Sequence, residues 1–389
     1  MAANLGWKYD KDYFEGEYRN ENKYSTKNSY FTSVKLESYS SIYQFAYSKD
    51  MLNLKDDFSL TIAYPGLMTG TGIAHGIKGR DNVFKLGFYF DYTTGMPVLP
   101  GSSIKGLLRS YFPSSYKDKY PDEYEFRVKY ITALVNAINT KLSEFSIEQE
   151  IDNFLKDKIA AIEREVIVQK ENIRQNLESE IEALLENVTP ENELALLQRM
   201  ENLDNEIEEK IKILILKKKE SAIRQKDLEN LNKQLNNRKK RELQNWKKTL
   251  KEMVFQEIDP SAELNVEFLE KEIFEGKKFI KLDDQNWPVY KAISTYHRDI
   301  FHDAALSGNG LFLDTDYITP HKDQFQEPNP IMFLKIRPDI QIRFFFDLKD
   351  SVNGLLSKEG KLILFETILS TFGIGAKTNV GYGQFSKVK

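Results

Sequence analysis

The chain has 389 residues and a net charge of −4, which allows two ordinary domains or one domain with a large insertion. Cysteine is absent, so disulfides, thiolate metal ligands and a cysteine nucleophile are excluded. The weak net charge excludes a general polyanion binder and restricts any nucleic-acid surface to a local patch. The first residues lack an apolar signal core, and no stretch approaches the ~20 apolar residues of a membrane helix. We therefore expect a soluble cytoplasmic protein without a membrane partner.

Two early segments show the alternation of a half-buried strand, around Leu60–Tyr64 and over Phe84–Asp91. A glycine-rich loop, Pro65–Gly76, lies between them and contains His75. Its last glycine falls one residue late for a dinucleotide fingerprint, and no phosphate loop of the ATPase type occurs elsewhere. The sequence therefore predicts no nucleotide cofactor.

A short helix is predicted from Ser102 to Phe112. Ser102 and Ser103 are good N-cap residues, and the apolar residues that follow recur at helical spacing. Lys105 and Arg109, four residues apart, share the opposite face. Free N–H groups at a helix start, two hydroxyls and two bases would form a phosphate cradle. A capped surface helix with ordinary cations is an equal alternative on spacing alone.

The composition changes abruptly between Asp122 and Gln256. Glycine is absent there, and apolar residues recur at steps of three and four, which is the spacing of a coiled coil. The segment Thr189-Pro190-Glu191 is typical of a new helix start. This insertion of 135 residues leaves 254 for the body. The predicted organisation is therefore a body made of residues 1–121 and 257–389, interrupted by an antiparallel helical hairpin at 122–256.

Charge is distributed unevenly along this hairpin. Residues 169–209, around the turn, carry twelve acids and three bases, a net charge of −9. Residues 210–251 carry fifteen bases and four acids, a net charge of +11. A solvated coiled-coil surface explains the acidic tip. The basic runs Lys217–Lys219 and Arg238–Arg241 are explained equally well by an RNA path or by an acidic partner.

The second part of the body mixes strands with short helices. Alternation over Ile340–Phe346 indicates a strand, and helices are predicted at about Pro288–Ala304 and at Gly360–Phe372. Strands in hairpin-like order with a few helices favour an α+β fold, with helices on one face of the sheet.

A second glycine-rich loop directly follows the last predicted helix. Gly373, Gly375, Gly381 and Gly383 bracket a short segment that contains Lys377. Glycine is used where the backbone takes positive φ or comes close to another group. A helix C-cap explains only the first glycine. We therefore favour a loop that presents its N–H groups and Lys377 to a phosphate chain.

Three of these segments together resemble the RAMP proteins of CRISPR effector complexes, most closely the sixth-type Cmr subunit of the type III-B complex. The segments are Tyr64–Gly72 (YPGLMTGTG), Phe84–Ser110 and Phe372–Phe385 (FGIGAKTNVGYGQF), and Ile300–His321 with Asn329–Lys335 fits the same subunit. The resemblance covers most of the body and none of the hairpin.

The resemblance implies a ferredoxin-like sheet that binds guide RNA, and a place at the end of the backbone stack that holds the 3′ region of the guide. The implied partners are guide RNA, target RNA and other Cmr subunits. The implied subunit is not an enzyme and has no metal or cofactor. The implied RNA-binding residues are Gly373, Gly375, Lys377, Gly381 and Gly383 in the loop, with Ser102, Ser103, Lys105 and Arg109 in the helix.

Two other hypotheses remain. Some RAMP relatives cut guide precursors without a metal, with a histidine as general base, and His75 is the residue we would nominate among four histidines. A histidine that stacks on a base or is simply solvated is the commoner case. The aspartates Asp91, Asp303, Asp314 and Asp316 are not spaced as a metal site and are expected to cap turns. A scaffold whose body merely anchors the hairpin is the third hypothesis.

Overall fold

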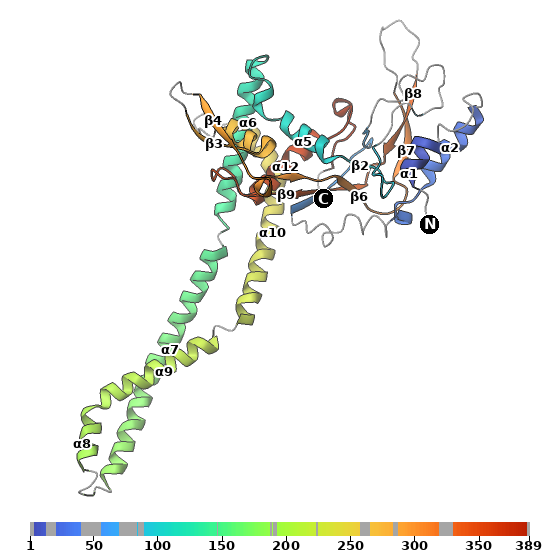
Figure 1. Cartoon of the computed structure of the whole chain (residues 1–389). Coiled ribbons are helices and arrows are strands. Elements are labelled where there is room, and N and C mark those ends of the chain that lie inside the picture. Colours follow the sequence, from blue (N-terminus) through green and yellow to red (C-terminus); the bar gives the residue numbers. More distant parts are fainter. Residues whose placement is uncertain are drawn as a thin grey trace. The chain divides into compact units, whose positions relative to one another are not determined.

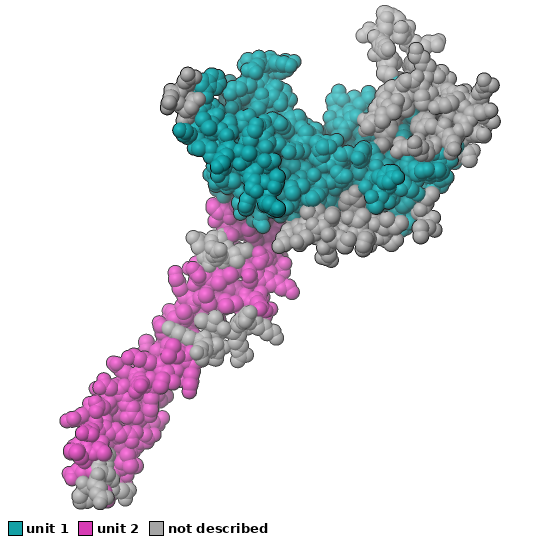
Figure 2. Space-filling view, viewed as in Figure 1, with its two compact units in different colours: residues 1–141, 246–389 teal, residues 142–245 magenta. Residues whose placement is uncertain are grey.

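The computed structural model describes residues 4–12, 21–39, 56–69, 84, 89–145, 147–186, 189, 193–222, 225–256, 265–282, 287–318 and 330–386 (Figure 1). The chain forms two compact units, shown in Figure 2: residues 1–141 with 246–389, which we call the body, and residues 142–245, which we call the hairpin unit. No helix in the described ranges is long and apolar enough to cross a membrane.

A five-stranded antiparallel sheet lies at the centre of the body. Strand β9 is its central strand and pairs with three others, and the predicted strand over Ile340–Phe346 is thereby confirmed. Ile342, Phe344 and Phe346 are fully buried, and Phe345 on the opposite face is buried as well, so both faces of β9 are covered. The sheet order is β1 (Asp56–Thr61), β9 (Gln341–Asp347), β6 (Ala304–Ser307) and β2 (Val98–Leu99), with β5 (Ile300–Phe301) paired to β9.

Helix α12 (Lys358–Phe372) packs against β1 and α5. It begins after Ser357, whose hydroxyl accepts the N–H of Gly360 at 3.1 Å. Its Phe365 ring lies 5.5 Å from the rings of both Phe301 and Phe346, centroid to centroid. Apolar residues all round the helix are buried because α5 (Gly101–Ser110), α6 (Pro121–Ser143) and the sheet surround it.

Two smaller sheets complete the body: β3 (Lys277–Leu282) with β4 (Pro288–Ala292), and β7 (Leu313–Ile318) with β8 (Ile331–Ile336). Mixed helices and antiparallel sheets confirm the α+β class, whereas the ferredoxin-like arrangement stays a prediction. The other helices are α1 (Leu5–Trp7), α2 (Glu21–Ser33) and α11 (Val266–Glu270), with π-helical segments at Lys8–Asp12 and Lys271–Glu275 and 3₁₀ segments at Leu36–Tyr39, Pro113–Ser115, Thr295–His297 and Thr378–Val380.

The helix predicted at about Pro288–Ala304 is wrong. This segment forms β4, a 3₁₀ turn and β5, and Ala304 begins β6. Ile300 and Phe301 pair with Asp347 and Phe346 of β9, and such β-branched and aromatic residues fit a pleated surface. Long-range pairing with β9 therefore decides the local structure. The predicted strand over 84–91 lies mostly outside the described residues.

The hairpin unit consists of α7 (Ile147–Leu185), α8 (Glu193–Glu201), α9 (Leu203–Ala222) and the first part of α10 (Gln225–Gln256). As the residue number rises along α7, the number of its ion-pair partner in α8 and α9 falls. The two arms of the hairpin are therefore antiparallel, as Figure 1 shows. The buried seam between them includes Ile162, Val166 and Ile207. Coiled-coil packing in the strict sense stays a prediction. The ion pairs that fix the direction are Glu165–Lys218, Arg174–Asp204 and Glu180–Arg199.

A buried ionic network connects α12 to the rest of the body. The ammonium of Lys361 lies 2.7 Å from Asp299 Oδ2 and 3.7 Å from Glu272 Oε1, and all three side chains are almost completely buried. The backbone N–H of Lys349 donates to Asp299, and Ser351 Oγ and the Val352 N–H donate to Glu272. Burial raises the pKa of Asp299, while the Lys361 ammonium opposes that rise. Each buried charge therefore depends on the others, and removal of Lys361 would leave its two partners without a counter-charge.

We expect Lys361→Met to lower the free energy of unfolding by about 3–5 kcal/mol, because two buried carboxylates lose their counter-charge. Urea denaturation followed by circular dichroism measures the change. The control is Lys358→Met, an exposed lysine at the start of the same helix, which we expect to have little effect. Equal denaturation midpoints for the two variants would contradict the assigned role.

Candidate nucleic-acid interface

The C-terminal glycine loop, residues 373–383, is closed by contacts between its own two ends. The Ile374 N–H donates to the Gly383 carbonyl at 2.9 Å. A Cβ on Gly383 would lie 1.8 Å from the Ile374 carbonyl oxygen, and one on Gly373 would lie 2.5 Å from the Gly383 oxygen. Gly373 and Gly383 also have positive φ angles, 77° and 68° respectively. These two glycines are therefore needed for backbone packing and geometry.

The loop rests on the first glycine-rich segment of the chain. The Gly383 N–H donates to the Gly66 carbonyl, and the Ala376 N–H donates to the Met68 carbonyl, both at 2.8 Å. A Cβ on Gly375 would lie 2.5 Å from the Met68 oxygen. Leu67 in turn exchanges two backbone hydrogen bonds with Ile336 of β8. Residues 66–68 and the C-terminal loop, which the sequence presented as separate motifs, therefore belong to one site.

The exposed crest of the loop, residues 375–380, has the geometry of an anion site. Lys377 is left-handed, with φ of 57°, and the 3₁₀ turn Thr378–Val380 follows it. Within the described part of the chain, the N–H groups of Lys377, Thr378 and Asn379 donate to no protein acceptor. Successive N–H groups in a left-handed to right-handed backbone form a concavity that binds anions. The exposed Lys377 side chain adds a positive charge there.

An exposed aromatic residue, Tyr64, directly precedes the proline that approaches the glycine loop. Gly381, with φ of 98°, would place a Cβ 3.4 Å from Pro65 Cδ. The preceding Tyr64 is 84% exposed. An exposed ring next to a phosphate-binding loop is suited to stack on a nucleic-acid base. Tyr64 falls within the strand predicted around Leu60–Tyr64, whereas β1 ends at Thr61. The Pro-Gly pair that follows Tyr64 was the signal that the strand had ended.

Tyr382 is a structural residue of the loop. Its ring is buried, and its hydroxyl donates to Asp316 Oδ2 at 2.8 Å, an oxygen that Lys335 Nζ also contacts at 2.6 Å. Burial tends to raise the pKa of Asp316, but the hydrogen bonds from Lys335 and Tyr382 outweigh it and hold that pKa below its usual value. Burial and the Asp316 carboxylate raise the pKa of Tyr382.

The start of helix α5 differs from the prediction. The helix begins at Gly101 after Pro100, and no side chain caps it, so Ser102 and Ser103 lie exposed inside the first turn. The Gly101 N–H donates to Asp303 Oδ1 at 2.7 Å. The Asp303 carboxylate, from the connection between β5 and β6, therefore already occupies part of the positive end of the helix.

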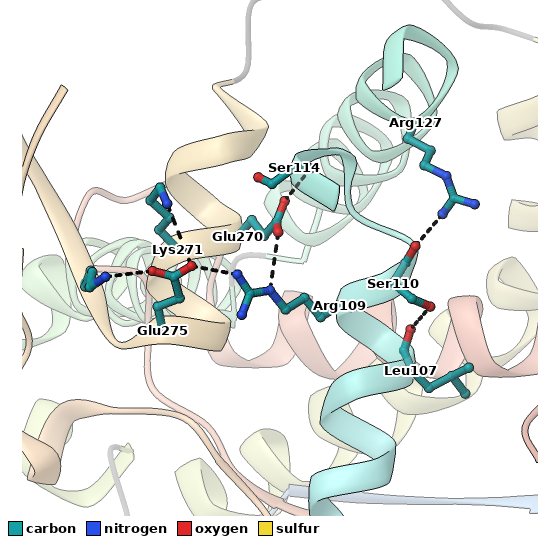
Figure 3. Close-up of polar contacts among 9 residues, drawn as sticks. Leu107, Arg109, Ser110, Ser114, Arg127, Glu270, Lys271 and Glu275 are labelled. Atoms are coloured by element: carbon teal, nitrogen blue, oxygen red, sulfur yellow. Dashed lines mark hydrogen bonds and ion pairs between the residues drawn. The ribbon is translucent and has the colours of Figure 1, made fainter. Parts of the chain in front are cut away.

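The two predicted bases of α5 have different environments. Arg109 donates to Glu275 Oε1 at 2.6 Å, and its Nε lies 3.5 Å from the buried Glu270 (Figure 3). Two carboxylates thus neutralise Arg109, and its role is to connect α5 to the segment 266–275. Lys105 forms no ion pair among the described residues. Partial burial, with the charges of Arg109 and Arg298, lowers the pKa of Lys105.

The contacts place the C-terminal end of α5 near the glycine loop. Tyr111 stacks on Phe372, the residue before Gly373, with a centroid distance of 4.2 Å. Ser102 and Ser103 lie about 13 Å away along the helix axis. The predicted loop residues therefore come together in one site, whereas the hydroxyls of α5 lie at the other end of the helix.

The described histidines and aspartates do not gather into a metal-binding cluster. His75 lies outside the described residues. His302 Nε2 is buried without a hydrogen-bond partner, and desolvation lowers the pKa of His302. No cluster of three potential metal ligands occurs in the described ranges. Asp91 caps a turn by accepting the N–H of Thr94 at 2.7 Å, as expected for a loop aspartate.

The body is thus an α+β, antiparallel-sheet protein that presents a glycine-rich anion loop. Residues 59–386 match the RAMP superfamily, and the chain belongs to this family. Its structure is similar to a chain in the cryo-EM structure of type III-B Cmr-beta bound to cognate target RNA, with 15% identity and a TM-score of 0.38 over 96% of this chain and 77% of that one. No curated protein sequence matches the chain significantly.

We expect Gly383→Ala to destabilise the body by about 2–4 kcal/mol, because the new Cβ meets backbone and the positive φ is strained. Chemical denaturation measures this change. Gly106→Ala is the control, because Gly106 lies in α5 with nothing within 4 Å of an added Cβ. That variant should be neutral or stabilising by roughly 0.5–1 kcal/mol. Equal effects of the two substitutions would refute the assigned close approach.

The lowered pKa of Asp316 predicts a pH-dependent contribution to stability. A carboxyl with a depressed pKa stabilises the fold above its unfolded value, and this contribution is lost as the pH falls through the folded pKa. We expect Asp316→Asn to lower the thermal midpoint at neutral pH, with a difference from wild type that shrinks below about pH 4. Thermal melts over this pH range test the prediction. A difference that persisted unchanged at low pH would contradict it.

Proposed function

We propose that this RAMP protein is a non-catalytic RNA-binding subunit of a type III-B CRISPR ribonucleoprotein. The observation that carries the proposal is the crest at residues 375–380, where the N–H groups of residues 377–379 have no acceptor in the described part of the chain and the Lys377 side chain is exposed. Backbone N–H groups and lysine bind phosphate without reading base identity. This chemistry suits a protein that holds a guide of any sequence and leaves target choice to base pairing.

The proposal assigns different roles to the predicted residues. Gly373, Gly375, Gly381 and Gly383 shape the loop, and Lys377 with its neighbouring amides contacts a phosphate. The exposed ring of Tyr64 supplies a stacking surface for a base.

Helix α5 provides a second contact in this proposal. Ser102, Ser103 and Lys105 supply hydroxyl donors and a positive charge to the RNA backbone. Arg109 positions the helix, because its charge is already engaged by Glu270 and Glu275.

The finer role follows from the resemblance of the loop and helix motifs to the sixth-type Cmr subunit. The chain would hold the 3′ region of the guide RNA at the end of the backbone stack, in contact with other Cmr subunits and near the target RNA. The family has both catalytic and non-catalytic members, and the proposed subunit is of the non-catalytic kind.

We expect Lys377→Glu to reduce the guide RNA that copurifies with the complex about tenfold, the equivalent of one charge-assisted contact of about 1.4 kcal/mol. The tagged chain is purified from its host, its small RNAs are sequenced, and its protein partners are identified. Small RNAs with a constant 5′ handle and a variable remainder are expected.

Lys358→Glu is the matched control, since it reverses one exposed charge at the opposite end of α12. Its RNA yield should equal that of wild type. Unchanged guide retention in Lys377→Glu would overturn the proposed site. Metal-independent cleavage of repeat RNA by the purified chain, lost in His75→Ala, would favour the endoribonuclease alternative.

A further inference from the structure

Ion pairs account for several of the cations that the sequence placed on the hairpin. Lys218 pairs with Glu165, and Arg199 pairs with Glu180 and Glu206. In the basic run of α10, Arg238 donates to Glu242 at 2.8 Å. Its charge is therefore already balanced. Each basic run therefore contains cations that are paired within the chain, so the whole run is not available to a ligand.

A different set of α10 cations makes no ion pair with any described residue. Lys233, Lys240 and Arg241 are exposed, and no described carboxylate forms an ion pair with them. Glu229, one turn before Lys233, makes no ion pair with it. Electrostatic repulsion among these cations is therefore not relieved within the described part of the hairpin unit.

These cations share one face of the helix. At 3.6 residues per turn, Lys233, Asn237, Lys240, Arg241 and Gln244 fall within an arc of about 100° and span about 16 Å. The buried Leu243 lies outside this arc. We call the surface formed by these five residues the α10 basic face.

The α10 basic face lacks the features of a protein-binding surface. Its side chains are lysine, arginine, asparagine and glutamine, and it has no aromatic or aliphatic side chain. Cores of protein interfaces are depleted in lysine and rely on buried aromatic or apolar anchors. Contacts to a nucleic-acid backbone, in contrast, come mainly from arginine, lysine, asparagine and glutamine.

We propose that the α10 basic face binds the phosphate backbone of single-stranded RNA, as a contact separate from the glycine loop. The inference assigns an RNA-binding role to the helical insertion, which contains none of the sequence motifs that resemble the sixth-type Cmr subunit. It rests on the charge and exposure of the α10 residues and does not require the crest at 375–380 to bind RNA. Binding would be electrostatic, independent of sequence and strongly dependent on salt.

The test uses the full chain and a labelled oligouridine of about 30 nucleotides. Affinity is measured between about 50 and 200 mM salt for wild type and for the triple variant Lys233→Gln, Lys240→Gln, Arg241→Gln. Glutamine keeps the helix propensity of the residues that it replaces, so the helix should remain folded. The control triple, Lys156→Gln, Lys170→Gln, Lys212→Gln, removes the same charge from exposed, scattered positions of α7 and α9.

We expect the α10 triple to reduce the slope of log affinity against log salt by about 2, since each single-strand phosphate contact contributes about 0.7. Affinity at the lower salt should fall about tenfold, while the control triple should change both quantities much less. Equal effects of the two triples, or no effect of the α10 triple, would overturn the proposal. Failure of the wild type to bind at the lowest salt would overturn it as well.

A Lys377→Glu arm separates this inference from the proposed function. Loss of RNA binding in Lys377→Glu with no effect of the α10 triple would leave the glycine loop as the RNA site and refute RNA binding by the α10 basic face. The reverse pattern would support the α10 basic face and count against the loop. Loss of a copurifying acidic protein from the α10 triple, with RNA binding unchanged, would assign the face to a protein partner instead.

Discussion

The position of α12 is the constraint on which the body depends. Lys361 is buried beside Asp299 and Glu272, and backbone N–H groups complete the hydrogen bonds of both carboxylates. A buried charge without its partner costs several kcal/mol, so the helix cannot slide or rotate without exposing the network to a large penalty. The helix in turn carries the glycine loop at its C-terminal end, beside the stacked pair Tyr111 and Phe372. The buried Lys361 network, which has no part in ligand binding, thus fixes where α12 places the candidate site.

The backbone of the glycine loop has two separate roles in the candidate site. Gly373, Gly375 and Gly383 are needed where two backbones approach within the space of a side chain, and this packing would be required in a protein with no ligand. The backbone of Lys377 and its neighbours is different, because the residue is exposed and the N–H groups of residues 377–379 find no acceptor in the described chain. Within the described part of the loop, these donors lack a partner, and an anion would satisfy both the amides and the lysine. The helical insertion adds a basic face whose composition suits the same class of ligand.

Much of the local structure could be predicted from the sequence. The periodic segments of α7 and α12 and the strand β9 form where hydrophobic spacing placed them, because in each case burial of one or more faces dominates. The helix prediction for Pro288–Ala304 failed because the short apolar group Ile300–Phe301 acquires its structure only by pairing with β9. Ferredoxin-like strand order and strict coiled-coil packing were implied by resemblance or spacing and stay predictions.

The sequence by itself determined the residue types: in the glycine loop, glycines that permit positive φ with one lysine between them, and separately, in the insertion, runs of basic residues. Tertiary structure decided which of these groups are available. Arg109 and Tyr382 are occupied by Glu275 and Asp316, whereas Lys377 and Tyr64 are left exposed. The physical reason is that the availability of a charge or an aromatic ring depends on partners far away in the chain, 166 positions for Arg109 and 66 for Tyr382. Local patterns carry no information on such partners, because only folding brings them within hydrogen-bond distance.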